Sequence, residues 1–121
     1  MADQSLLRRP LHEVAPLIQQ RELSPVELTT LSLEAIEQTN PTQNSFRLVM
    51  AEKALEAART AETEIASGTY RGPLHGMPIA VKDLMDIAGE TSAAGSKVLA
   101  DRVATEDSEA VRLLREGGAV I

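Results

Sequence analysis

The chain has 121 residues, and its 12 Lys and Arg are outnumbered by 18 Asp and Glu, which gives a formal net charge of -6. This length fits one small domain, and the acidic balance argues against nucleic acid as a direct partner, because phosphates are neutralised by clustered positive charge. The absence of cysteine excludes disulfides, thiolate nucleophiles and cysteine-ligated metals. The two histidines, His12 and His75, have no ligand-like spacing, so neither a metal nor another cofactor is predicted.

The N-terminus contains arginines but lacks the apolar core of a signal peptide. No apolar run approaches the ~20 residues needed to cross a bilayer. We therefore expect a cytoplasmic protein without a membrane partner.

The first half of the chain is predicted to be helical. A weak amphipathic pattern covers 11–20, although Pro16 argues against a regular helix there. The sequence Ser-Pro-Val-Glu at 24–27 predicts a clear helix start, because serine caps, proline fits the first helical position and the glutamate completes a capping box. This helix is expected to end near Thr39, because a proline pushes the residue before it, in Asn40-Pro41, out of helical backbone. Its expected buried face comprises Leu28, Leu31, Ala35 and either Leu33 or Ile36.

A third helix is predicted over 48–67, with Gly68 as its terminator. Its apolar positions follow three-four spacing: Ala51, Ala54, Leu55, Ala58, Ala61 and Ile65. A stripe so rich in alanine predicts close packing against a flat partner surface. The helical half, 11–68, is interpreted as scaffold with a solvated charged face.

The second half of the chain has a strand-like character. The segment 79–81 follows a Gly/Pro-rich turn and is typical of a short buried strand ending at Lys82. An irregular stretch, 86–102, precedes a helix expected to begin near Thr105, and the apolar segment 119–121 predicts another strand. Strand, crossover helix and strand form a βαβ unit, so the fold class is expected to be α/β with parallel pairing.

The sequence stops within this last strand signal. Parallel sheets are normally wider than two strands and covered on both faces. We therefore expect the chain to be an incomplete part of a larger fold. The alternative is that Val120 and Ile121 dock as a simple tail.

Lys82 is the main chemical candidate. An ammonium at the edge of an apolar environment is unfavourable unless it is paired or loses its proton, and desolvation of lysine is one way to make a general base at neutral pH. The alternative is structural, since a lysine at a strand end commonly extends to solvent or pairs with a nearby carboxylate. Here that carboxylate would be Asp83 or Asp86.

Other polar residues in this half have structural interpretations. The glycines do not form a phosphate-binding loop, since Gly76 is followed by methionine rather than by lysine. His75 is interpreted as a hydrogen-bonded turn residue. Ser92 and Ser96 lie outside any nucleophile-elbow sequence and are interpreted as turn-forming hydroxyls.

Three segments resemble the amidase signature family. The segment 72–99, GPLHGMPIAVKDLMDIAGETSAAGSKVL, resembles the family's opening motif, and 107–121 resembles the helix and glycine-alanine-valine strand that follow it. Upstream, 23–58 resembles the family's two N-terminal helices and the Asn-Pro link between them. The resemblance covers about 11–121. It implies that 1–121 is the N-terminal part of a single domain, helical over 11–68 and strand, loop, helix and strand over 72–121, in a mixed sheet sandwiched by helices.

The resemblance also implies a mechanism. Family members cleave, or transfer from, small-molecule carboxamides with a serine nucleophile, a bridging serine and a lysine that corresponds to Lys82. That lysine would be kept neutral by burial and would accept a proton through the bridging serine, while backbone amides stabilise the oxyanion. Water then resolves the acyl-enzyme, or ammonia is transferred in the amidotransferase branch.

The Gly-Gly-Ser-Ser-Gly-like segment that supplies both serines in the family is absent from this chain, which is therefore expected to be inactive alone. Three interpretations remain open. The first is a truncated amidase, and the second is the amidase subunit of a tRNA-dependent amidotransferase, with a protein partner and aminoacyl-tRNA. The third is a non-catalytic helical binding module. The sequence determines neither the amide substrate nor the oligomeric state, and pairing through the N-terminal helices stays open.

Overall fold

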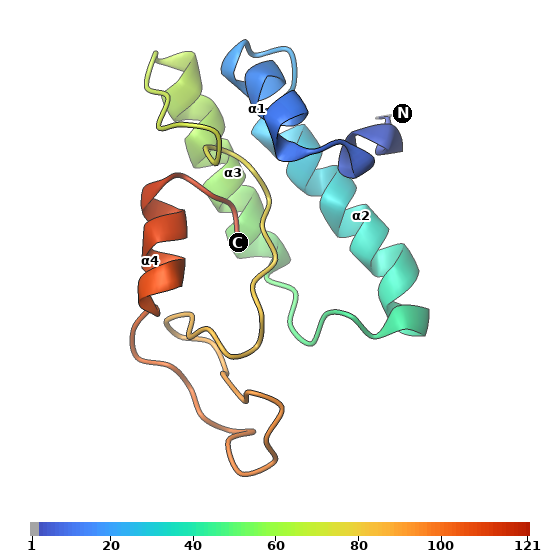
Figure 1. The fold of residues 1–121 in the computed structure, drawn as a ribbon, viewed down its shortest axis with the longest axis vertical. Helices are drawn as coiled ribbons and strands as arrows, with labels where there is room; N and C mark the ends of the chain where they lie inside the picture. Colours follow the sequence, from blue (N-terminus) through green and yellow to red (C-terminus); the bar gives the residue numbers. More distant parts are fainter. Residues whose placement is uncertain (1–2) are drawn as a thin grey trace.

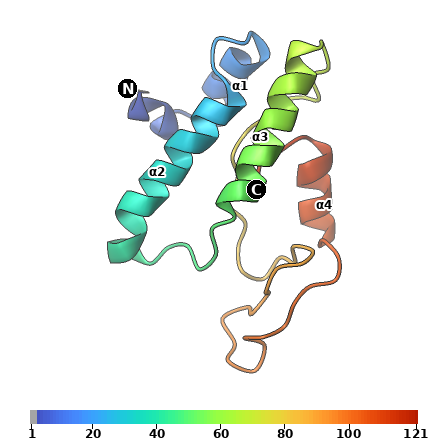
Figure 2. The same cartoon turned by 180° about the vertical axis from the view of Figure 1, so that it is seen from behind.

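The computed structural model describes residues 3–121, as a helical N-terminal part and a C-terminal part built of loops and one further helix (Figures 1 and 2). Within residues 3–121 the elements are a 3-10 helix η1 (Gln4–Arg8) and four α-helices: α1 (Leu11–Gln19), α2 (Pro25–Gln43), α3 (Ala51–Ala66) and α4 (Glu109–Glu116). Helix α2 packs against α3 and against η1. None of the helices in this range is long and apolar enough to cross a membrane.

The weakly predicted helix near the N-terminus is confirmed as α1. It accommodates Pro16 and buries Val14, Ala15 and Ile18. These three side chains join the larger apolar cluster of the molecule, together with Leu28 of α2. Helical stability in proteins comes mainly from such packing rather than from local propensity, which explains why the proline does not prevent the helix.

The predicted start of α2 is confirmed. The Ser24 hydroxyl accepts hydrogen bonds from the backbone N–H of Val26 (3.0 Å) and Glu27 (3.2 Å), so two donors of the first turn are satisfied. The same hydroxyl donates to Glu62 of α3. The cap therefore also links the two main helices.

The predicted end of α2 is wrong, because the helix continues through Asn40-Pro41 to Gln43. Asn44 caps its C-terminal end with a left-handed φ of 50°. The Asn40 side chain exchanges two hydrogen bonds with the Phe46 backbone: Nδ2 donates to the carbonyl (2.9 Å) and Oδ1 accepts from the N–H (2.8 Å). These bonds hold Asn40 in place and offset the backbone bond that the proline removes.

The predicted alanine stripe of α3 is confirmed in its central part. Ala54 and Ala58 are buried and pack with Val120. Ala61 and Ile65 are buried as well. Alanine lets the C-terminal segment approach the helix closely, so the flat surface that the stripe was expected to face is formed partly by that segment.

The predicted strands do not form within residues 3–121, and the α/β class with its βαβ unit is not confirmed. Segments 76–79 and 118–120 lie parallel, joined by three backbone hydrogen bonds of 2.7–2.9 Å, but they form only one isolated bridge, between Pro78 and Val120. Two causes limit this pairing. Proline has no N–H to donate, and a lone pair of short strands is marginal without further neighbours.

The last helix begins at Glu109 rather than near Thr105. Asp107, expected in its first turn, lies outside it, where its Oδ1 accepts a hydrogen bond from the Ala88 N–H (2.8 Å). Its Oδ2 forms an ion pair with Arg115 of α4 (2.9 Å). Asp107 therefore ties the preceding loop to the helix, and this competing role explains the later start.

The turn 72–76 and the C-terminal segment meet at a very close contact. Gly118 has a φ of +82°, and a Cβ on this residue would lie 2.4 Å from Cδ2 of the buried His75 ring. Real Cβ atoms essentially never approach so closely. Glycine is therefore required here both for the backbone conformation and for space.

We predict that Gly118→Ala destabilises the chain more than Gly89→Ala does, by about 1–3 kcal/mol, the usual cost of overpacking. Gly89 is a matched control because its φ is nearly the same, +81°, while nothing lies within 4 Å of its Cβ position. The free energy of unfolding in urea, measured for both variants, checks this. Equal losses would show that only the backbone conformation matters at Gly118.

Candidate active site

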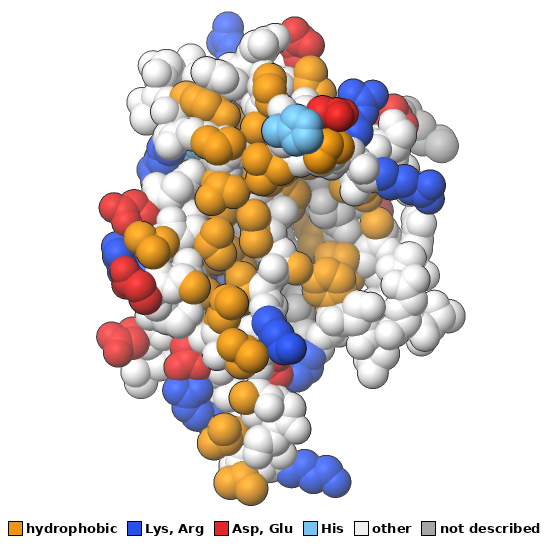
Figure 3. All heavy atoms as spheres, viewed as in Figure 1, with side chains coloured by type: hydrophobic (Ala, Val, Ile, Leu, Met, Phe, Trp, Pro, Cys, Tyr) orange, Lys and Arg blue, Asp and Glu red, His pale blue; other side chains and the backbone are white. Residues whose placement is uncertain are grey.

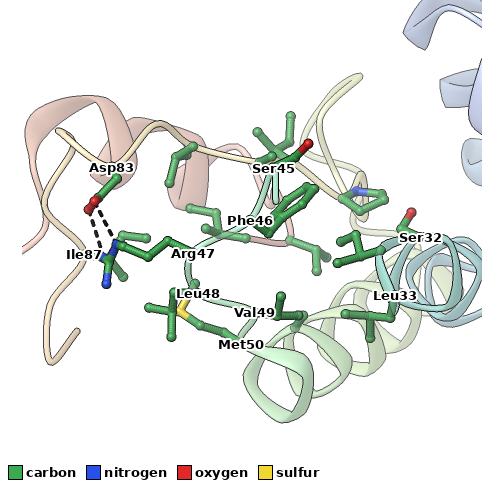
Figure 4. Close-up of a pocket in the computed structure, with 18 of the residues that line it drawn as sticks. Ser32, Leu33, Ser45, Phe46, Arg47, Leu48, Val49, Met50, Asp83 and Ile87 are labelled. Carbon is green, nitrogen blue, oxygen red and sulfur yellow. Dashed lines mark hydrogen bonds and ion pairs between the residues drawn. The ribbon is translucent and has the colours of Figure 1, made fainter. Parts of the chain in front are cut away.

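The described chain has a largely apolar cavity of ≈ 720 Å³ (Figure 4). It is lined by one face of α2, by the α2–α3 linker and by the segment that follows the Gly/Pro-rich turn. Its apolar lining includes Leu33, Ile36, Phe46, Val49, Met50 and Ile87. Figure 3 shows a band of apolar side chains down the middle of the face seen in Figure 1, with most charged side chains around its edges.

The apolar face of α2 is divided between this cavity and the core. Leu28 and Leu31 are buried, as expected. Leu33, Ala35 and Ile36 are half-buried and line the cavity, so the prediction that this part of the face is core is wrong for the described chain. These three apolar side chains therefore form a surface that the other described residues do not cover.

Lys82 lines the cavity together with Val81 and Asp83. Its side chain is exposed, so the burial that the family resemblance implies for this lysine is not provided by residues 3–121. Lys82 takes part in none of the ion pairs of this part of the chain. Lys82 therefore lines the cavity without an ion-pair partner, and its role as a catalytic base stays a prediction.

Asp83, the residue after Lys82, is held by Arg47 from the α2–α3 linker. Nε of Arg47 lies 2.7 Å from Oδ2 of Asp83 and Nη2 lies 2.9 Å from Oδ1, the two-bond geometry drawn by the dashed lines in Figure 4. Hydrogen bonding from Arg47 holds the pKa of Asp83 below its usual value, against the opposing effect of burial. Arg47 also donates to the hydroxyl (3.0 Å) and the carbonyl (2.6 Å) of Thr91.

Asp86, the second carboxylate near Lys82, is held by a different arginine. Both terminal nitrogens of Arg102 donate to it, at 2.7 and 2.6 Å. These bonds, supported by the Ser92 hydroxyl, hold the pKa of Asp86 well below its usual value. Pairing of Lys82 with Asp83 or Asp86, the structural alternative for this lysine, is therefore not observed.

The interpretation of His75 as a hydrogen-bonded turn residue is confirmed. Its Nδ1 accepts from the Arg71 N–H (3.0 Å), and its Nε2 lies 2.8 Å from Oε2 of Glu64. The pKa of Glu64 is raised by burial, but hydrogen bonds from Arg71 and His75 outweigh that effect and leave it below its usual value. This cluster joins the end of α3 to the turn and does not line the cavity.

The two serines of the irregular stretch also have structural roles. The Ser96 hydroxyl accepts from the Val98 N–H (3.2 Å), as in a turn. Ser92 is buried, its hydroxyl contributes to the lowered pKa of Asp86, and neither serine lines the cavity. The stretch is more ordered than expected, because Thr91 and Val103 form an antiparallel bridge.

Sequence reasoning missed Arg47 entirely. One signal was available: a single arginine stands in the otherwise apolar run Phe46-Arg47-Leu48-Val49-Met50. A charge in such a run is expected to have a specific partner, because an apolar run packs against other apolar surface.

Comparison with known proteins gives the family. The family model described as Amidase matches residues 27–121, most of the chain. The chain belongs to the amidase family. The matched region includes Lys82 and nearly all of the cavity lining.

Individual relatives agree with this assignment. The chain is 42% identical over 119 residues to "Putative amidase AmiD" of Mycobacterium tuberculosis, covering 98% of this chain and 25% of that protein. It is 42% identical over 115 residues to a glutamyl-tRNA(Gln) amidotransferase subunit of Azoarcus sp., covering 95% of this chain and 23% of that protein.

A solved structure supports the fold as well. It is described as a vestigial protein complex that reveals the evolutionary origins of an s-triazine catabolic enzyme, and it superposes with a TM-score of 0.88 and 32% identity, over 93% of this chain and 25% of that chain. This amidase-family chain therefore spans about a quarter of the length of the relatives it matches.

The ion pair of Asp83 makes a prediction for acid stability. A carboxylate whose pKa is lower in the folded than in the unfolded state stabilises the fold above its unfolded pKa, and that contribution is lost as pH falls through the folded pKa. We expect Asp83→Asn to destabilise the chain at about pH 6 and to reduce the further loss on going to about pH 3. Urea midpoints at both pH values measure this.

Asp101→Asn is the matched control, since Asp101 is exposed and takes part in no ion pair of the described chain. It should leave both midpoints close to those of the unaltered chain. An acid dependence of Asp83→Asn indistinguishable from that of the control would contradict the assigned ion pair.

Proposed function

We propose that this chain is the N-terminal part of an enzyme that hydrolyses the carbon–nitrogen bond of small-molecule carboxamides, with Lys82 as its catalytic base. The single observation that carries the proposal is the family match over residues 27–121. The proposal uses no metal or cofactor, and it leaves the identity of the amide open.

In the proposed mechanism, the neutral amine of Lys82 accepts a proton passed by a bridging serine from the attacking serine hydroxyl. The serine oxygen bonds to the amide carbon, the carbon–nitrogen bond breaks and ammonia or an amine leaves with a proton. Water then cleaves the acyl-enzyme to give the carboxylic acid. Both serines would be supplied by residues beyond this chain.

The surroundings of Lys82 support this role. Lys82 lines a largely apolar cavity, and the two nearby carboxylates with which it could pair, Asp83 and Asp86, are each held by an arginine instead. The remaining requirement, exclusion of water from the amine, would have to be met by the rest of the enzyme or by bound substrate. Apolar cover over the cavity would meet it.

A second candidate function is the amidase subunit of a tRNA-dependent amidotransferase. The identity to the amidotransferase relative is as high as that to the amidase, 42% in both cases. In this case ammonia released by hydrolysis would be transferred, and a protein partner would be required. A non-catalytic binding module, the third interpretation, has no specific observation in its favour.

Lys82→Ala tests the base assignment in a protein that continues beyond this chain. We expect the rate of hydrolysis of a reactive carboxamide to fall by about 10²–10⁴-fold, the range that general bases contribute. The urea midpoint of unfolding should change little. Ammonia release and urea unfolding measure the two effects. Lys97→Ala is the control, because Lys97 is also exposed but does not line the cavity. Activity retained in Lys82→Ala would refute Lys82 as the base.

The 121-residue chain alone is proposed to be inactive, because none of its serines matches the nucleophile of the family. A serine-reactive phosphonate should therefore fail to form a covalent adduct with it. Intact-mass spectrometry checks this, with an active full-length amidase as the positive control. A stoichiometric adduct on any serine of this chain would contradict the proposal.

A further inference from the structure

Four charged side chains of residues 3–121 line the cavity: Arg47, Lys82, Asp83 and Glu90. Arg47 pairs with Asp83, and Glu90 pairs with Lys53 of α3. Asp86, outside the lining, pairs with Arg102. Among the charged side chains of residues 3–121 that line the cavity, Lys82 is therefore the one without an ion pair, although a carboxylate follows it directly in the chain.

The contacts of Arg47 explain how this state is maintained. Its guanidinium makes two hydrogen bonds to Asp83 and two to Thr91, so three separate segments of the chain meet at one side chain. The Ala93 N–H adds a further bond to Asp83 Oδ1 (3.3 Å). The planar fork of arginine suits this geometry, which a lysine could not reproduce.

We propose that Arg47 is a positioning residue, which holds the Asp83 carboxylate in a two-bond ion pair and so keeps Lys82 at the cavity without an anionic partner. The inference rests on the proposed function only for the role of Lys82 as a base. The effect of Arg47 on the charges around Lys82 does not depend on that function. A lysine beside a free carboxylate favours its protonated form, which cannot accept a proton.

The physical consequence can be measured without a substrate. The chain contains three lysines, Lys53, Lys82 and Lys97, and Lys97 is an exposed internal reference. Only the unprotonated amine reacts with an acylating reagent. The ratio of labelling at Lys82 to labelling at Lys97, measured by peptide mass spectrometry at low ionic strength, therefore reports how strongly the surrounding charges favour the ammonium form.

The two single variants should have opposite effects. Arg47→Gln frees the carboxylate of Asp83 beside Lys82, and we expect the labelling ratio to fall about three- to sixfold, the effect of one unit charge about 4–7 Å away in water. Asp83→Asn leaves the guanidinium of Arg47 without its anion, and we expect the ratio to rise by a similar factor. The double variant Arg47→Gln/Asp83→Asn should restore the original ratio.

These signs separate positioning from a purely structural role. General loosening of the cavity would move both single variants in the same direction, and the double variant would not recover. An unchanged ratio in Arg47→Gln, or shifts of equal sign, would overturn the proposal. If Arg47→Gln does not fold, as judged by circular dichroism, the rise expected in Asp83→Asn decides the question alone.

The measurement is also independent of the proposed function. Full activity in Lys82→Ala of the longer protein would refute Lys82 as the base and leave the labelling result unaffected. Conversely, Lys82→Ala could abolish activity while Arg47→Gln leaves the labelling ratio unchanged. That result would support Lys82 as the base and refute the positioning role of Arg47.

Discussion

The close parallel contact between the turn that contains Gly76 and the C-terminal segment is the constraint on which the second half of the molecule depends. The Gly76 N–H donates to the Gly118 carbonyl at 2.9 Å, and a Cβ on Gly118 would meet the His75 ring. This contact places Val120 on the alanine stripe of α3. It also sets the direction in which the chain leaves the turn toward Lys82.

The scaffold follows from local chemistry that can be recognised in the sequence. The serine cap of α2 and the alanine stripe of α3 were predictable because each depends on residues close together in the chain or at regular spacing. The end of α2 was not predictable, because the hydrogen bonds between the Asn40 side-chain amide and the Phe46 backbone outweigh the local effect of Pro41. The absence of the predicted strands was not predictable either, because strand formation depends on neighbouring strands, and the local sequence does not show whether these are present.

The candidate site could be predicted only in part. Lys82 was singled out by the apolar segment before it and by resemblance to a family. Arg47, which holds the neighbouring carboxylate of Asp83, lies 36 residues from that aspartate in the sequence. Pairings at such separation leave little local trace. An arginine alone in an apolar run is the one trace that this chain offers, and it predicts a partner without naming it.

The bonds between Asn40 and Phe46 have a consequence for how this region can vary among relatives. They close a small ring of backbone between α2 and the linker, so the number of residues in that ring is fixed by geometry. An insertion there would rotate Phe46 and the following Arg47 away from the cavity. The loop at 94–101 lies beyond the bridge of Thr91 with Val103, and most of its residues are exposed. Differences in length among homologues should therefore accumulate in that loop and avoid the connection between the two long helices.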